Sequence, residues 1–294
     1  MKRELKKAKR AVWLYRYFGQ DIPLEYLEYV IKCQCCSKDF LEKFVLDYHL
    51  PQAFEMMFLE EYVKKDENLV AAYIKKFGCC KNVGHHMLIA LSGSLFLYDV
   101  LNQTVPLDKD AQLAFFKGIH DKNERLKFVA KYRQSFYPCT VDYLLQMQNC
   151  DLFTAYVPAI TFGNGLPPHQ EQIIIRSKNL ALFEILVSHC EVSNNTLESL
   201  ITDDNIDYLQ VYFVHHYIPS FIQRHLAKHG DKKLLALYVD KHPLSDEALF
   251  LLVNKGYKDI LKLHYLNYGI SERVLAYQAN LTRFKSYIGI DETN

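Results

Sequence analysis

The sequence is poor in glycine and proline, the residues that most often form the tight turns of β-sheet proteins. Its 294 residues include only 11 Gly and 9 Pro, too few for a chain of many short strands. Charge of one sign is also missing, because 35 Lys and Arg face 34 Asp and Glu. Half of the residues are hydrophobic, so the composition excludes a disordered chain and favours a folded one with a large core.

The sequence also lacks the short motifs that mark common enzymes. It contains no Gly-rich phosphate loop, no G-x-S-x-G elbow and no H-E-x-x-H pair. Carboxylates are scattered, and Glu60-Glu61 next to Lys64-Lys65 is typical of a solvated helix face with supporting charge pairs. We therefore expect a non-enzymatic protein with no catalytic residues and no cofactor.

Long hydrophobic runs are absent as well. No stretch approaches the length of a membrane span, and Arg16 interrupts the segment after the basic N-terminus before an export sequence could form. Eight cysteines without an export signal favour a reducing compartment. We expect a cytoplasmic protein with no membrane partner, in which the basic residues of segment 2–10 form the polar face of an N-terminal capping helix.

The C-terminal half contains an internal repeat. A hydrophobic residue followed by a small or turn-favouring one, here called the anchor pair, recurs every 26 residues. The anchor pairs are Leu166-Pro167, Val192-Ser193, Ile218-Pro219, Leu244-Ser245 and Ile270-Ser271. A period between about 20 and 50 residues is typical of stacked supersecondary units that bury their apolar faces against their neighbours.

Apolar columns within the period predict two short helices per unit. The first helix has apolar residues four, eight and nine positions after the anchor, as at Ile222, Leu226 and Ala227, which is the spacing of one buried helix stripe. The second helix shows the same spacing at Leu234 and Tyr238. Helices this short are marginal alone in water, so each unit must depend on the units that flank it.

A break separates the two helices of each unit. The breaks are Lys178-Asn179, Asp204-Asn205, Gly230-Asp231 and Gly256-Tyr257. Gly, Asn and Asp accept left-handed or capping conformations at low cost, so the first helix should end at these points.

The N-terminal half follows the same hairpin pattern with looser spacing. We predict helix pairs at 24–32 with 40–48, 52–64 with 68–77, 85–91 with 95–101, 110–119 with 123–134, and 141–148 with a weak helix around 153–160. Segment 161–168 is interpreted as a loop between repeat blocks, with a domain boundary as the alternative. We expect one helical-repeat domain over residues 1–294, irregular over 1–160 and regular over 161–294.

The predicted fold is all-α, an α-solenoid of stacked antiparallel helical hairpins forming an ankyrin-like or HEAT-like superhelix. The stretch 248–269 resembles an ankyrin helix pair, with a short first helix, a turn containing Gly256 and a second helix that runs to Gly269. The Thr-Pro-Leu-His opening of that family is absent, and 26 residues leave no room for its β-hairpin. The resemblance implies a protein-interaction scaffold whose binding surface comes from the helices themselves.

The candidate binding surface is a polar ridge on the solvent side of the first helices of successive units. Its predicted partner-binding residues are Arg176, Arg224, His225, Lys228, Asn254 and Tyr277. Arg176, Lys228 and Asn254 share one column with Thr202 and Asn280, and the other three lie beside it. Exposed aromatic residues would supply anchors, with Phe221, Phe250 and Tyr277 as candidates. Phe250 and Tyr277 have a packing alternative, because either ring could cover a neighbouring unit.

The function hypothesis is a protein- or peptide-binding scaffold that uses the concave face of the solenoid. Nucleic-acid binding is the alternative, favoured by the basic N-terminus and by the cations of the ridge and opposed by the overall charge balance. The simplest interpretation of the ridge is that its residues are merely exposed, since every helix presents a polar face.

Cysteine and histidine clusters raise metal binding as a further alternative. The clusters are Cys33, Cys35 and Cys36, and Cys79 and Cys80 followed by His85 and His86. Thiolate and imidazole groups are zinc ligands, but this spacing matches no standard zinc pattern. We expect Cys33 and Cys36 to lie on an amphipathic helix and to pack as small hydrophobic residues, with no metal bound.

Overall fold

The computed structural model describes residues 2–78, 83–104, 107–161, 165–230, 232–277 and 281–290. All regular secondary structure in these ranges is helical, with no strand. The all-α prediction is therefore confirmed. The chain divides into two compact units, Met1–Tyr143 and Leu144–Asn294, and each is described by itself. The single repeat domain over 1–294 stays a prediction.

Unit 1 (Met1–Tyr143) contains every helix that the sequence predicts there, with ends shifted by a few residues. The helices are α1 (Lys2–Phe18), α2 (Leu24–Ile31), α3 (Lys38–Asp47), α4 (Gln52–Tyr62), α5 (Glu67–Phe77), α6 (Val83–Leu91), α7 (Leu95–Thr104), α8 (Lys109–Gly118) and α9 (Lys122–Tyr132), then a 3-10 turn (Arg133–Ser135) and α10 (Pro138–Gln146), which crosses the unit boundary. Side chains of Ser37, Asp66, Asp108 and Asp121 accept backbone N–H groups of the helices that follow them, which fixes where those helices start.

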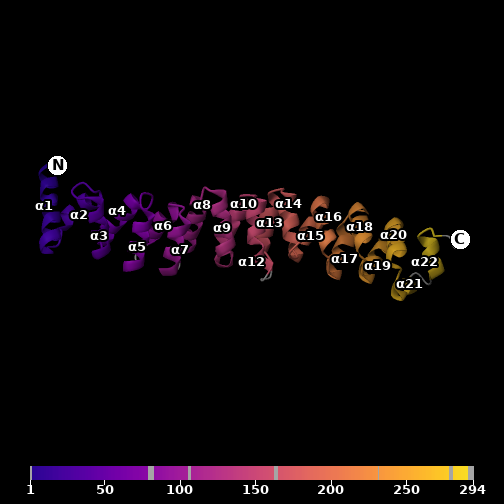
Figure 1. The fold of residues 1–294 in the computed structure, drawn as a ribbon. Helices are drawn as coiled ribbons and strands as arrows, with labels where there is room; N and C mark the ends of the chain where they lie inside the picture. The colour runs from indigo at the N-terminus through magenta and orange to yellow at the C-terminus, as the bar shows by residue number, and fades with distance from the viewer. Residues whose placement is uncertain are drawn as a thin grey trace. The chain divides into compact units, whose positions relative to one another are not determined.

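Helices of unit 1 contact the helix two places along the chain, in two alternating rows (Figure 1). One row contains α2, α4, α6 and α8, and the other contains α3, α5 and α7. Between α8 and α9 the core is aromatic, with the fully buried Phe128 against Tyr98, Phe115 and Phe116. Gly93, at φ +70°, lies so near Gly118 that a Cβ atom would stand 2.5 Å from the Gly118 carbonyl oxygen, so this joint requires glycine.

Unit 2 (Leu144–Asn294) contains two helices in each complete period, as predicted. They are α11 (Cys150–Tyr156), α12 (Pro158–Thr161), α13 (Pro168–Arg176), α14 (Leu180–Val187), α15 (Asn194–Thr202), α16 (Ile206–His215), α17 (Ser220–His229), α18 (Lys232–Lys241), α19 (Asp246–Lys255), α20 (Lys258–Tyr268), α21 (Glu272–Tyr277) and α22 (Leu281–Tyr287). The weak helix expected around 153–160 is divided between α11 and α12. In the predicted loop, residues 162–164 lie outside the described ranges.

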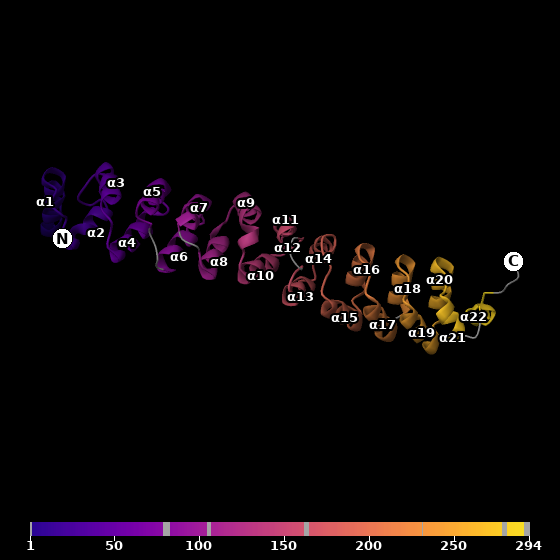
Figure 2. The ribbon, with the colours of Figure 1, turned by 90° about the horizontal axis from the view of Figure 1, so that it is seen from below.

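Two rows of helices run through unit 2 as well (Figure 2). The A row is α13, α15, α17, α19 and α21, and the B row is α11, α14, α16, α18 and α20. Anchor residues Leu166, Val192, Ile218 and Leu244 are buried. Burying one such side chain contributes roughly 1.5 to 3 kcal/mol, so the anchors tie each turn to the core.

The predicted breaks adopt left-handed backbone at three of their four positions. Lys178, Asp204 and Gly256 have φ of 56°, 53° and 69°. Gly230 takes the capping alternative, because its φ is −67° and its N–H donates to the carbonyl of Leu226 where α17 ends. A Cβ atom there would stand 2.7 Å from the carbonyl oxygen of Leu226, so glycine serves close packing at this break. Asp231 lies outside the described residues.

Carbonyl groups near the ends of successive B helices accept hydrogen bonds from side chains of the next hairpin in unit 2. His216 Nε2 donates to the carbonyl of Val187, His242 Nε2 donates to that of Phe213 over 2.6 Å, and Asn267 Nδ2 donates to that of Val239 over 3.4 Å. The three carbonyls are 26 residues apart. Carbonyls in the last turn of a helix have no partner within it, so the repeat satisfies them from the neighbouring hairpin.

A second set of bonds joins adjacent repeats at every second junction, through buried polar side chains that the sequence did not reveal. The Glu171 carboxylate accepts the backbone N–H of Ser193 at 2.8 Å and the hydroxyls of Ser193 and Thr196 at 2.6 Å each. Two periods later, Gln223 Oε1 accepts the backbone N–H of Ser245. Both acceptors occupy the fifth position after an anchor, which is leucine in the intervening units.

Candidate functional site

The predicted ridge residues all lie on the A row of unit 2. Arg176 ends α13, Asn254 is on α19, Tyr277 ends α21, and Arg224, His225 and Lys228 are on α17. All are exposed except His225, which is half-buried. Asn280 lies outside the described residues. Their solvent placement is as expected, and their role in binding stays a prediction.

One hydrogen bond joins each successive pair of A helices from α15 to α21. His225 Nε2 lies 3.0 Å from Thr202 Oγ1, Lys255 Nζ donates to the Lys228 carbonyl over 2.6 Å, and the Tyr277 hydroxyl donates to Asn254 Oδ1 over 2.9 Å. We call the surface formed by these residues together with Arg224 the A-row ridge. Arg176, on α13, has no hydrogen bond to it among the described residues.

The Thr202 bond fixes the tautomer of His225. Thr202 Oγ1 donates its only hydrogen to the carbonyl of Glu198 over 2.8 Å. It can therefore only accept from His225, so Nε2 of His225 carries the hydrogen. The imidazole is oriented before any partner arrives.

Helix α17 gives the ridge its positive charge. Its sequence contains Arg224, Lys228 and two histidines, and no Asp or Glu. Among the described residues, neither Arg224 nor Lys228 forms an ion pair. The His225 and His229 rings lie 4.5 Å apart between centroids. Desolvation, followed by the nearby charges of His225, Lys228 and Lys255, lowers the pKa of His229. The cations that α17 supplies to the ridge are therefore Arg224 and Lys228, and α19 adds Lys255.

The aromatic candidates divide between anchoring and packing. Phe221, in the first turn of α17, is 49% exposed. Phe250 instead packs against Tyr277, with ring centroids 5.1 Å apart and planes tilted by 59°, and lies beneath the Arg273 guanidinium at 5.7 Å. It therefore covers the neighbouring helix, as its packing alternative states. Tyr277 takes part in that contact yet keeps 55% exposure. Phe221 and Tyr277 are therefore the rings available to a partner.

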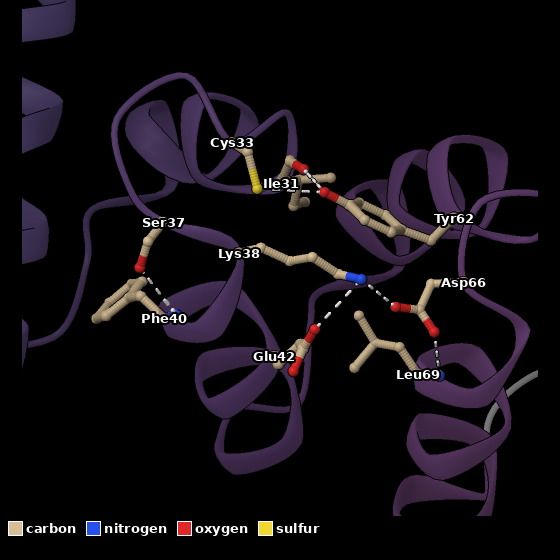
Figure 3. Close-up of polar contacts among 9 residues, drawn as sticks. All are labelled: Ile31, Cys33, Ser37, Lys38, Phe40, Glu42, Tyr62, Asp66 and Leu69. Carbon is tan, nitrogen blue, oxygen red and sulfur yellow. Dashed lines mark hydrogen bonds and ion pairs between the residues drawn. The ribbon is translucent and has the colours of Figure 1, made fainter.

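The cysteine cluster of unit 1 lies in a turn. The expectation that Cys33 and Cys36 lie on a helix is wrong, because α2 ends at Ile31 and Cys33 adopts left-handed backbone at φ 52°. Figure 3 shows Cys33 directed at the Tyr62 hydroxyl. Cys79 and Cys80, of the second predicted cluster, lie outside the described residues.

The two histidines of that second cluster are buried. His85 and His86 lie in α6, with His85 Nδ1 3.6 Å from the Glu55 carboxylate. Within the described ranges, no three His, Cys, Asp or Glu side chains are arranged to hold a metal ion.

Comparisons with known proteins give no relative. No protein-family model, no curated protein and no solved structure matches the chain. None of the described helices combines the length and the apolar character needed to cross a membrane. The ankyrin resemblance therefore stays a resemblance.

Proposed function

We propose that each unit is an α-solenoid of stacked antiparallel hairpins and that the chain is a non-enzymatic scaffold which binds a peptide segment of another protein along the A-row ridge. The alternating helix contacts and the 26-residue register of the capped carbonyls support the stacking. The hydrogen bonds between successive A helices support a preformed surface, which reduces the ordering cost of binding.

The single observation that carries the proposal is the exposed face of α17. It presents Arg224 and Lys228, which have no carboxylate partner in the part of the chain that the structure describes, and Phe221 half-exposed beside them. Cations positioned on a rigid surface attract and orient an oppositely charged segment, and an aromatic ring supplies apolar contact area. The partner that fits is an acidic peptide with at least one large apolar residue.

Nucleic acid is the second candidate, because the same cations would also neutralise phosphates. Phosphate binding by these side chains would weaken steeply with salt and would not depend on an apolar residue in the ligand. An acidic peptide would lose affinity both with salt and on removal of its apolar residue.

The test is a titration of the full chain with three fluorescent probes, an acidic peptide containing one Trp, the same peptide with Trp replaced by Ser, and a single-stranded RNA. We expect the first probe to bind most tightly. The double variant Arg224→Ala/Lys228→Ala should weaken it about tenfold, as expected for roughly 1.4 kcal/mol.

The control removes the same charge from the B row. Lys233 and Lys241 are exposed on α18, and Lys233→Ala/Lys241→Ala should change the affinity less than about twofold. Equal losses in the two double variants would show a general charge effect and contradict binding at the ridge. If the RNA binds and neither peptide does, the proposed partner is wrong and the second candidate, nucleic acid, takes its place.

A further inference from the structure

The turn after α2 holds three thiols in an unusual backbone. Helix α2 ends in a Schellman arrangement, with the N–H of Gln34 bonded to the Tyr29 carbonyl at 2.8 Å and the N–H of Cys33 bonded to the Val30 carbonyl at 2.9 Å. The residue at the left-handed position of this motif is usually glycine, and here it is Cys33, at φ 52°. A cysteine therefore occupies a position where any side chain is disfavoured.

Tyr62 of α4 orients the Cys33 thiol. The Tyr62 hydroxyl donates its only hydrogen to the Ile31 carbonyl over 3.0 Å. Cys33 Sγ lies 3.3 Å from the same oxygen, so the thiol is the donor in that contact. Figure 3 shows this chain from Cys33 through Tyr62 to Ile31. The contact fixes the direction of a half-exposed sulfur.

Cys36 folds back over the end of the same helix. Its Sγ lies 3.5 Å from the Val30 carbonyl oxygen, the same oxygen that accepts the Cys33 N–H at 2.9 Å. The hydrogen bond with Cys35, followed by burial, raises the pKa of Cys36, which disfavours its thiolate, so Cys36 is the second of the two thiols to react. The hydrogen bond with Cys36, aided by the charge of Lys9, lowers the pKa of the buried Cys35.

Geometry selects one pair among the three thiols. Cys35 and Cys36 are joined by a trans peptide bond, which sets their Cα atoms about 3.8 Å apart. Disulfides usually join Cα atoms about 4.4 to 6.8 Å apart. Cys33 and Cys36 are separated by two residues, both contact the Val30 carbonyl oxygen and are both partly exposed, whereas Cys35 is buried.

We propose that Cys33 and Cys36 are a thiol modification site that closes to a disulfide with a small-molecule disulfide such as oxidised glutathione. The Cys33 thiolate attacks one glutathione sulfur and releases one glutathione thiolate, which takes up a proton. The Cys36 thiolate then attacks the mixed disulfide at Cys33 and releases the second glutathione. Two protein thiols are oxidised, one glutathione disulfide is reduced to two thiols, and the protein's two thiol protons pass to glutathione through solvent.

Closure would change the joint between α2 and α4. Once oxidised, Cys33 has no hydrogen to donate, so the contact from its sulfur to Tyr62 is lost while Tyr62 keeps its bond to Ile31. The neighbouring ion pair of Lys38 Nζ and Asp66 Oδ2, at 2.8 Å, joins α3 to the start of α5 and uses neither thiol. The surrounding helices therefore keep their own restraints in thiol variants.

The native full chain is incubated with oxidised glutathione and then unfolded in urea with an alkylating reagent, so that every free thiol is blocked, including the buried Cys35. The tryptic peptide of residues 33–38, which follows Lys32 and ends at Lys38, is then analysed. In the reduced protein all of Cys33, Cys35 and Cys36 carry the reagent. After incubation we expect the peptide to carry it once, at Cys35, with the two other cysteines joined and reducible.

Single variants identify the pair. Cys33→Ser and Cys36→Ser should abolish closure completely, while the matched Cys35→Ser should still close. Circular dichroism checks that each variant is helical. The proposal is overturned if the native peptide keeps three alkylated cysteines, if it accumulates only a glutathione adduct, or if Cys35→Ser prevents closure.

Discussion

The two units build the same kind of helix pair and hold the pairs together differently. In unit 2 the contacts between successive hairpins recur at nearly the same spacing, since the bonds from His216, His242 and Asn267 span 29, 29 and 28 residues. In unit 1 the contacts between hairpins are individual, as in the cluster of rings around Phe128 and the bonds from Lys131 and Tyr132 to Asp99.

This difference explains why the sequence period is regular in one unit and drifts in the other. A hydrogen bond to a carbonyl demands a narrow range of distance and angle, so the capping residue recurs within one residue of a fixed spacing. Ring contacts tolerate a range of offsets and tilts. Unit 1 can therefore change the spacing of its helices without losing its core.

The largest expected effect comes from the centre of the aromatic cluster. Phe128→Ala should lower the free energy of unfolding by about 4 kcal/mol, since it leaves a large cavity and removes several ring pairs. The equally buried Phe183 of unit 2 contacts one ring among the described residues, Tyr208, and Phe183→Ala should cost about 3 kcal/mol. Urea unfolding measures both losses, and a larger loss at Phe183 would break the comparison.

The buried carboxylate of unit 2 comes next. Glu171→Leu leaves the Ser193 N–H and the Thr196 hydroxyl without their acceptor, so it should lower the free energy of unfolding by about 3 kcal/mol. Glu171→Gln keeps one acceptor oxygen and should cost about 1 kcal/mol. If both variants unfold at the same urea concentration as the native chain, the buried hydrogen bonds of Glu171 contribute nothing to the stability of unit 2.

A smaller loss is expected at the capped carbonyls of the B row. His242→Ala should cost about 1 kcal/mol, the net value of one hydrogen bond. His242→Asn should recover part of the loss, because Asn267 makes the equivalent bond one unit later. Thermal unfolding followed by circular dichroism is the readout, and an Asn variant no better than Ala would argue against a shared register.

The smallest effect is a dependence on pH. Nε2 of the buried His264 accepts the N–H of Leu244 at 3.1 Å, and burial lowers the pKa of His264. Below about pH 6.5 the unfolded chain therefore binds a proton that the folded chain does not, so stability falls as the pH falls. Replacement by His264→Gln should reduce this slope between pH 6.5 and 5. If the slope is unchanged, the dependence of stability on pH comes from titratable groups other than His264.

The sequence predicts the helices of unit 2 well because their buried columns are apolar and periodic. It fails at Glu171 and Gln223, since a polar residue in an apolar column shows its hydrogen bonds only once its partners are in place. The helical placement expected for Cys33 and Cys36 is wrong because a cysteine rarely takes the left-handed position that follows the end of a helix, as Cys33 does here. On the ridge, the column predicts exposure at Asn254 and Tyr277, while their bond depends on side-chain rotamers that no periodicity contains.

The central claim is that the hairpins of unit 2 stabilise one another through contacts that recur from each hairpin to the next. Hydrogen exchange followed by mass spectrometry tests it most directly, with the native chain compared against Glu171→Leu. The account predicts faster exchange in α13 and α15 and also in their neighbours α14 and α16, with α2 to α5 unchanged. Faster exchange confined to α13 would contradict it.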